Sequence, residues 1–349
     1  MIRTIVMSAG LLLGCSTATG VQAADWLARI SDRTYVSRLS IPGTHDAATG
    51  NGFAVGFDLF GRRFALTQDK PLAEQWHCGI RAFDLRPAVC QGRDGAPYLH
   101  LFHGAMQTKL TMADALKILR DSLAGHPTEF AIIVMRHEDG ADKGDARWGS
   151  LMNELLHSAG FKDLFAAFKP DLTVGELRGK ILLLSRDEYG DTPVGAYVRA
   201  WTHAADFALQ AGARICTPRA ESRLYVQDFY DMSFADGLRI KCACIRRMLD
   251  FSTRLHQAGQ PPVWVINHTS GYSKTDNGMG YPNATADGYR ENASITNQTV
   301  IDYLADASHA GPTGLVMMDF AGENLSGNYR VQGLALTQAI IANNFRREM

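Results

Sequence analysis

Proton-transferring side chains follow several short apolar runs of this 349-residue chain. The first such run leads into His45 and Asp46, and another run ends at His103. Between them, Asp84 and Arg86 close the motif Phe-Asp-Leu-Arg. Two histidines suit phosphodiester transfer, because one imidazole deprotonates the attacking hydroxyl while the other protonates the leaving oxygen. A guanidinium adds a planar fork that binds phosphoryl oxygens and offsets their growing negative charge. These residue types therefore indicate acid–base chemistry on a phosphodiester.

Further apolar runs end in charged groups in the same way, at Arg136, Arg186, Asp228 and Asp319. In a barrel of parallel strands, the carboxyl ends of all strands face one rim, and the active sites of such barrels lie there. Asp46 and Asp319 are suited to orient the imidazoles and to stabilise their charged form. Asp84 lies two residues before Arg86, so both side chains point to the same face of a strand.

The elements that must position these groups are eight apolar runs alternating with helix-patterned segments. The runs span residues 38–41, 79–85, 98–102, 130–135, 181–184, 224–226, 263–266 and 315–318, and the helical segments span 69–76, 112–123, 146–158, 194–209, 234–258 and 295–307. Such alternation predicts a parallel sheet, and eight units favour a (β/α)8 barrel. We expect one α/β domain over residues 25–349.

One segment, residues 269–290, differs in composition because it is rich in Gly, Asn, Asp and Tyr. It predicts a long loop, and loops of this length in compact domains are usually functional. Its tyrosines suit a lipid interface.

Composition and the N-terminus limit the class of protein. A formal net charge of −1 argues against nucleic acid as a partner, because phosphate tracks require a basic surface. A positive start, an apolar run over residues 4–14, and Ala23 with Ala24 predict a signal peptide over residues 1–24. The alternative is a lipobox ending at Cys15, which would anchor the protein through a lipid. We expect a secreted or periplasmic monomer without a transmembrane helix.

The sequence shows no HExxH pair, no Gly-x-Ser-x-Gly motif and no phosphate-binding loop. We therefore expect neither a catalytic serine nor a zinc site, and no cofactor. Nine further histidines match no motif and are expected to be structural or exposed: His77, His100, His126, His137, His157, His203, His256, His268 and His309.

Three motifs together are similar to bacterial phosphatidylinositol-specific phospholipase C. They are Leu-Ser-Ile-Pro-Gly-Thr-His-Asp at 39–46, Gly-Ile-Arg-Ala-Phe-Asp-Leu-Arg at 79–86 and Phe-His-Gly at 102–104. The similarity continues through residues 129–136, 179–186, 225–230 and 318–320, and so covers most of the chain from residue 25. The resemblance implies an irregular, incompletely closed TIM-like barrel.

The resemblance also implies roles for the polar residues. His45 matches the general base that deprotonates the inositol 2-hydroxyl, with Asp319 as its partner. His103 matches the general acid for the diacylglycerol leaving group, assisted by Asp46. Arg86 matches the residue that replaces the calcium ion of metal-dependent relatives. The implied reaction needs no metal, forms inositol 1,2-cyclic phosphate, and then hydrolyses it slowly.

The headgroup positions follow from the same resemblance. Arg186, Asp228 and Tyr230 match inositol-binding residues, the tyrosine stacking on the ring. Arg136 stands where the family often has lysine, which leaves open the preference among phosphatidylinositol, its glycosylated form and phosphorylated inositols. The expected partner is an inositol-containing lipid at a membrane surface.

Two other functions remain as alternatives. A metal-dependent glycerophosphodiester phosphodiesterase would need a carboxylate cluster, to which Asp46 and Asp84 could contribute, although Arg86 between them disfavours a cation. A lipid- or glycan-binding protein on a degenerate barrel would show no turnover.

Overall fold

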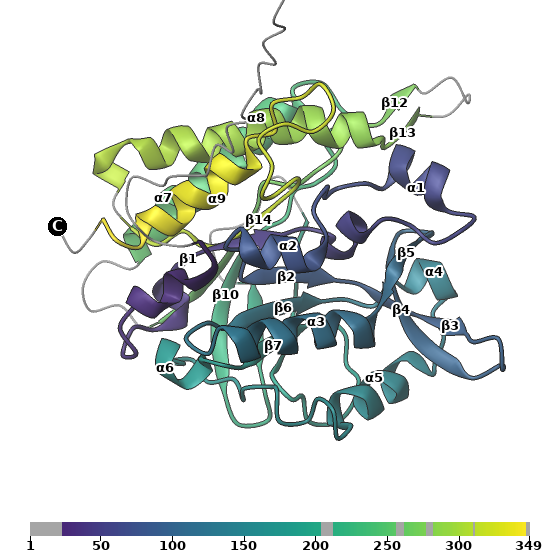
Figure 1. Cartoon of the computed structure of the whole chain (residues 1–349). Helices are drawn as coiled ribbons and strands as arrows, with labels where there is room; N and C mark the ends of the chain where they lie inside the picture. Colours follow the sequence, from purple (N-terminus) through teal and green to yellow (C-terminus); the bar gives the residue numbers. More distant parts are fainter. Residues whose placement is uncertain (1–22, 204–211, 256–261, 277–281, 310, 347–349) are drawn as a thin grey trace, which may run out of the picture.

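The computed structural model describes residues 23–203, 212–255, 262–276, 282–309 and 311–346, and a barrel of strands forms its centre (Figure 1). Neighbouring strands of the closed barrel follow the order β1-β14-β11-β10-β9-β8-β7-β6-β2. Their bounds are β1 Ser40–Thr44, β2 Ala82–Leu85, β6 Ala131–Met135, β7 Ile181–Ser185, β8 Ala196–Arg199, β9 Ala213–Cys216, β10 Glu221–Gln227, β11 Trp264–His268 and β14 Gly314–Met318. The single α/β domain and the TIM-like barrel are thereby confirmed, whereas the expected incomplete closure is wrong.

The strands pair in parallel except at β9, which runs antiparallel to both β8 and β10. Strands such as β6 and β7 are buried at every position, which explains why they read as unbroken apolar runs. Since the parallel strands share a direction, their carboxyl ends meet at one rim.

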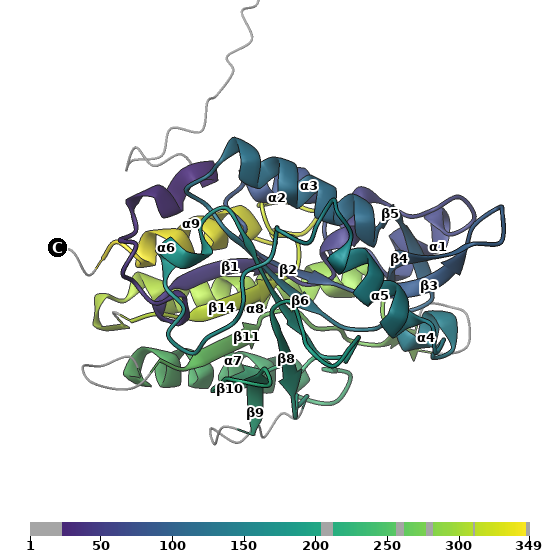
Figure 2. The ribbon, with the colours of Figure 1, turned by 90° about the horizontal axis from the view of Figure 1, so that it is seen from below.

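Helices surround the barrel, and Figure 2 shows α2 and α3 on one side of the strands and α7 on the other. The α-helices are α1 Asp58–Phe64, α2 Leu72–His77, α3 Met112–Gly125, α4 Asp139–Asp142, α5 Trp148–His157, α6 Val174–Leu177, α7 Gly237–Leu255, α8 Ala286–Ala305 and α9 Gly333–Asn343. Short 3-10 helices are η1 Ala23–Arg29, η2 Val36–Arg38, η3 Ala47–Asn51 and η4 Ala307–His309. Helix α3 illustrates the local cause, because Thr111 and Asp114 form a capping box and its apolar residues recur on one buried face.

A separate antiparallel sheet corrects one prediction. Strands β3 Pro87–Gln91, β4 Pro97–His103 and β5 Met106–Thr111 form this sheet, with β4 in its centre. The run at 98–102 was expected in the barrel. Residues 92–96, between β3 and β4, include Asp94 and Gly95, which favour a tight turn. Strands joined by such a turn form a hairpin, so β3 and β4 pair antiparallel.

Two other expectations are wrong in part. The segment 194–209 was expected to be helical, but its described part contains β8, in which Tyr197 and Val198 favour a strand. The loop predicted over 269–290 ends early, because α8 begins at Ala286 with Thr285 as its N-cap. Before it lie the short strands β12 Thr275–Asp276 and β13 Pro282–Asn283.

The predicted leader at residues 1–24, including Cys15, lies almost wholly outside the described residues. In the described ranges, no helix has both the length and the apolar character needed to cross a bilayer.

Candidate active site

The predicted catalytic side chains come from neighbouring strands at the rim. His45 follows β1, Arg86 follows β2 and Asp319 follows β14, and β1 pairs with both other strands. His103, the last residue of β4, reaches the same place from the antiparallel sheet. Gly43 permits this close approach of strands, because a Cβ there would lie 2.5 Å from the Met317 Sδ.

Backbone strain marks two positions at this rim. Asp46 has a φ of 45°, and Phe320, directly after Asp319, has a φ of 53°. Residues other than glycine rarely adopt this left-handed conformation, and they keep it where surrounding contacts impose it, often at functional sites. Of the two carboxylates nearest His45, Asp46 therefore lies on strained backbone itself, and Asp319 lies directly before a strained residue.

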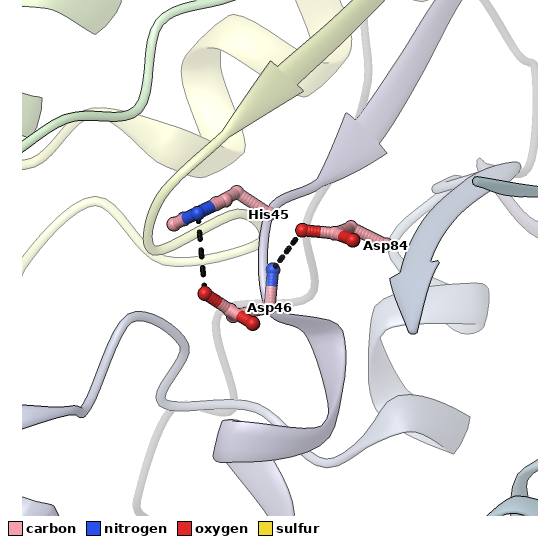
Figure 3. Close-up of side chains that lie close together, drawn as sticks. All are labelled: His45, Asp46 and Asp84. Atoms are coloured by element: carbon pink, nitrogen blue, oxygen red, sulfur yellow. Dashed lines mark hydrogen bonds and ion pairs between the residues drawn. The ribbon is translucent and has the colours of Figure 1, made fainter. Parts of the chain in front are cut away.

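His45 lies between these carboxylates. Its Nδ1 is 2.8 Å from Asp319 Oδ1. Its Nε2 is 3.1 Å from Asp46 Oδ2, the contact drawn in Figure 3. Burial alone would lower the pKa of His45, but the charges of Asp46 and Asp319 raise it to about 9. The ring of the free protein therefore carries a proton at neutral pH.

The Asp46 carboxylate is the centre of the cluster. Its Oδ2 also lies 3.3 Å from His103 Nε2, and its Oδ1 lies 3.0 Å from Arg86 Nε. The rings of His45 and His103 are 6.1 Å apart between centroids. His103 Nδ1 is 2.7 Å from the carbonyl oxygen of Ala65, which fixes the proton on Nδ1 and turns Nε2 toward Asp46. Two imidazoles and one guanidinium thus converge on one point.

Asp84 supports Arg86, as predicted from their spacing. Its Oδ2 accepts hydrogen bonds from Arg86 Nη2 at 2.7 Å and from the Asp46 backbone N–H at 3.1 Å, the latter drawn in Figure 3. Glu138 Oε2 lies 3.9 Å from Arg86 Nη1 and was missed from the sequence. Burial alone would lower the pKa of Arg86, but the charges of Asp46, Asp84 and Glu138 raise it well above its ordinary value. The guanidinium is permanently charged.

One cation-binding arrangement exists among the described residues. His45, Asp46 and Asp84 each offer one ligand atom, and these atoms lie within 4.8 Å of one another. The donor types fit a divalent cation. Both carboxylates already contact the Arg86 guanidinium, however, so a positive charge occupies their shared surroundings. The geometry favours the guanidinium over a metal ion.

The four predicted headgroup residues gather beside this cluster. Arg136 follows β6, Arg186 follows β7, and Asp228 and Tyr230 follow β10. Arg136 and Arg186 line a cavity of about 540 Å³. Burial lowers the pKa of Arg186 to about 10 despite the charge of Asp228. Asp228 stays ionised, because nearby imidazoles and Arg186 outweigh burial and hold its pKa far below the usual range.

Sequence reasoning missed His268, which was expected to be structural or exposed. It ends β11 at the rim and is buried, with its ring centroid 6.1 Å from that of His45. Burial lowers its pKa to about 4, so the ring is neutral. Polar residues that follow the other apolar runs are candidates for the rim. The same criterion applied to the run at 263–266 would have identified His268.

Gln68 was also missed, and it fastens two strand ends together. Its Nε2 donates to the carbonyl oxygens of His45 and Met318 at 2.8 and 2.9 Å, and its Oε1 accepts from the Ala321 N–H at 3.0 Å. No pattern in the sequence signals this role, because its partners come from two separate segments, one at His45 and one at Met318 and Ala321.

Comparisons with known proteins agree with this geometry. No family model matches the chain. The chain is 30% identical over 174 residues to a 1-phosphatidylinositol phosphodiesterase of Listeria monocytogenes, covering 48% of this chain and 50% of that protein. It is 25% identical over 210 residues to a protein of the same name from Staphylococcus aureus, covering 59% and 64%. The matches thus span less than two thirds of these relatives.

The fold comparison extends further along the chain. The solved phosphatidylinositol-specific phospholipase C of Listeria monocytogenes superposes with a TM-score of 0.66 at 21% identity, over 93% of this chain and 99% of that one. The similarity to this family expected from the motifs is confirmed, and the shared fold covers nearly the whole chain.

Proposed function

We propose that this protein is a phosphatidylinositol-specific phospholipase C. It cleaves phosphatidylinositol, or its glycosylated form, to diacylglycerol and inositol 1,2-cyclic phosphate. The observation that carries the proposal is the convergence of His45, His103 and Arg86 on the Asp46 carboxylate. The names of the curated relatives support the same substrate.

In the first step His45 acts as the base. Its neutral Nε2 takes the proton of the inositol 2-hydroxyl, while Asp319 stabilises the imidazolium that forms. The 2-oxygen attacks phosphorus, and the bond between phosphorus and the diacylglycerol oxygen breaks. His103 Nε2 donates a proton to that leaving oxygen, and Arg86 binds the phosphoryl oxygens as their charge grows.

The second step reverses the two roles. His103, now neutral, takes a proton from water, which attacks the cyclic phosphate. The bond from phosphorus to the 2-oxygen breaks, and His45 returns its proton to that oxygen. The product is inositol 1-phosphate, and both histidines regain their starting states.

The test is phosphorus NMR of the products released from phosphatidylinositol. We expect a cyclic phosphate signal first and a linear phosphate signal later. Linear phosphate from the outset would contradict transfer to the 2-hydroxyl.

A second candidate is the metal-dependent glycerophosphodiester phosphodiesterase, whose metal ion would need the donor set of His45, Asp46 and Asp84 as its ligands. We expect EDTA to leave hydrolysis of phosphatidylinositol intact, because Arg86 supplies the positive charge. Loss of activity with EDTA, its recovery with calcium or magnesium, and faster turnover of glycerophosphoinositol would support the second candidate instead.

One variant distinguishes an enzyme from a protein that only binds the lipid. We expect His45→Ala to abolish hydrolysis and to retain binding to phosphatidylinositol vesicles. A wild-type protein that binds the vesicles without releasing product would be a binding protein.

The place of action remains part of the proposal. We propose export by the leader at residues 1–24, or retention through a lipid on Cys15, and action as a monomer on an inositol lipid. Mass spectrometry of the mature N-terminus distinguishes cleavage near Ala23 from acylation of Cys15.

A further inference from the structure

Two side chains of the protein contact the residues of the proposed headgroup subsite and line the same cavity as Arg136 and Arg186. Trp201 and His203 lie shortly after β8, at the same rim as Arg186, Asp228 and Tyr230. Each of these three residues contacts Trp201 or His203. Neither was singled out from the sequence, where His203 was expected to be structural or exposed.

His203 makes the contacts that a hydroxylated ring would make. Its Nδ1 lies 2.9 Å from Asp228 Oδ2, at the distance of a hydroxyl donor. Its Nε2 lies 3.2 Å from Arg186 Nη2, in the place of a hydroxyl acceptor. Its ring packs edge-on against Tyr230, with the centroids 5.1 Å apart. One imidazole therefore contacts a carboxylate, a guanidinium and an aromatic face together.

Trp201 completes this arrangement. Its Nε1 donates to Asp228 Oδ2 at 2.7 Å, and the Arg186 guanidinium carbon lies 4.3 Å from the centre of its ring. Two protein nitrogens, one of them the hydrogen-bond donor of Trp201, thus lie against the same oxygen of Asp228. A headgroup that binds this oxygen must compete with them.

The backbone before these residues is strained. Ala200 has a φ of 56°, a conformation that glycine adopts freely and alanine rarely does. Strain of this kind persists where contacts impose it. Ala200 directly precedes Trp201, and we take the contacts of Trp201 and His203 as what holds this conformation.

We propose that His203 is an internal substitute for the headgroup ring and that substrate displaces it, with Trp201 adjusting beside it. Both residues thereby determine specificity, because only a ring that satisfies Asp228, Arg186 and Tyr230 at once replaces His203. This inference rests on the proposed function. Its thermodynamic consequence is that the occupied state lowers the apparent affinity for the headgroup.

Fluorescence provides the first test. The chain has five tryptophans. Four of them, Trp26, Trp76, Trp148 and Trp264, are at most 3% exposed, whereas Trp201 is partly exposed. We expect added myo-inositol to change the emission and the acrylamide quenching of the wild type. Trp201→Phe should lose this response. A response that survives in Trp201→Phe, or its absence in a wild type that binds myo-inositol, would overturn the proposal.

Affinity provides the second test, by calorimetric titration with myo-inositol. We expect His203→Ala to bind about 3- to 10-fold more tightly, because no competitor remains. Ala200→Gly should bind more weakly, because glycine removes the strain of the occupied state. His157→Ala, an exposed histidine on α5, is the matched control and should bind like the wild type. Weaker or unchanged binding by His203→Ala would overturn the proposal, since a residue that merely builds the subsite would lose contacts.

The outcome separates this inference from the proposed function. If the wild type hydrolyses phosphatidylinositol and His203→Ala gains no affinity, only the inference fails. If the wild type releases no product but His203→Ala binds myo-inositol more tightly, the inference stands and the proposed reaction fails. If the wild type does not hydrolyse the lipid, and neither the wild type nor His203→Ala binds myo-inositol, both the inference and the proposed function fail.

Discussion

The charge of His45 connects the geometry of single residues to the pH range of the reaction. A base must be neutral to accept a proton, but Asp46 and Asp319 hold the His45 proton in the free protein and raise its pKa to about 9. The same carboxylates that orient the ring therefore restrict its neutral form to alkaline pH.

We predict that kcat/KM rises with pH between about 6.5 and 9 as His45 of the free enzyme loses its proton. Asp319→Asn should shift this limb toward lower pH, because one of the two charges that raise the pKa is removed. Proton NMR titration of the imidazole, with His45→Asn for assignment, measures the pKa directly. Titration of wild-type His45 near 6.5 would contradict the prediction.

Linkage gives the sign of the stability effect. The folded pKa of His45 is raised, so its stabilisation is fully present below the unfolded value of 6.5 and is lost as pH rises through about 9. The stability difference between wild type and His45→Asn should shrink over this window.

The role of His103 as general acid can be tested with substrates that differ in their leaving group. We predict that His103→Ala slows hydrolysis of phosphatidylinositol by about 10²- to 10⁴-fold, because an alkoxide leaves poorly without a proton. A substrate with a nitrophenol leaving group needs no such proton. The rate at which His103→Ala hydrolyses this substrate should therefore fall much less. His45→Ala should impair both substrates, because both need the base. Equal losses for the two substrates in His103→Ala would contradict the role of general acid.

At the scale of elements, Gln68 joins the ends of β1 and β14 on which His45 and Asp319 depend. We predict that Gln68→Ala lowers the free energy of unfolding by roughly 1–3 kcal/mol, because buried backbone groups lose their partners. It should lower kcat as well, since the two strand ends are no longer tied. Gln298→Ala, whose amide bonds Asp302 on the exposed face of α8, is the control. Denaturant unfolding and steady-state kinetics measure both effects.

Helix α1 links the site to the expected lipid surface. Val55, Leu59 and Phe60 are 100%, 75% and 48% exposed, unusual for large apolar side chains grouped so closely. The helix ends at Phe64, and the carbonyl oxygen of the next residue, Ala65, lies 2.7 Å from His103 Nδ1. The exposed apolar side chains thus lie on and just before a helix whose following residue contacts His103.

We predict that Leu59→Ser with Phe60→Ser reduces hydrolysis of lipid vesicles several-fold and leaves hydrolysis of a soluble inositol phosphodiester unchanged. Burial of these side chains in the bilayer boundary would be lost, whereas the catalytic residues stay in place. Ile295→Ser, an exposed residue on α8, serves as the control. An equal reduction with both substrates would show that these α1 side chains contribute to stability rather than to lipid binding.

The elements also explain what the sequence could and could not predict. His45, Arg86 and Asp319 were placed correctly, because parallel strand ends meet at one rim whatever the strand lengths. His103 was placed correctly although β4 was assigned to the wrong sheet, because its motif identified the residue while the hairpin turn was overlooked. His203 lay in a segment expected to be helical, and only the folded chain brings it against Tyr230 and Asp228.

At the scale of the whole molecule, stability and chemistry lie at opposite ends of the barrel. Arg81 and Glu129 are fully buried just before β2 and β6, with Arg81 Nη2 2.9 Å from Glu129 Oε2. Arg81 also donates to the carbonyl oxygens of Trp76 and Ala24, and Glu129 accepts from the Leu27 N–H at 3.4 Å. The pair therefore fastens η1, at the beginning of the described chain, to the amino ends of two strands.

We predict that Arg81→Met lowers the free energy of unfolding by about 3–5 kcal/mol, because it leaves the Glu129 charge buried without a partner. Adding Glu129→Leu should restore much of that loss, since the unpaired charge is then gone. Denaturant unfolding of the two variants and of Glu129→Leu alone measures their coupling. Because the pair lies at the end of the barrel remote from His45, kcat of the folded fraction should remain at the wild-type value in the double variant. A double variant that folds as stably as the wild type but has lost turnover would show that the two ends of the barrel are coupled.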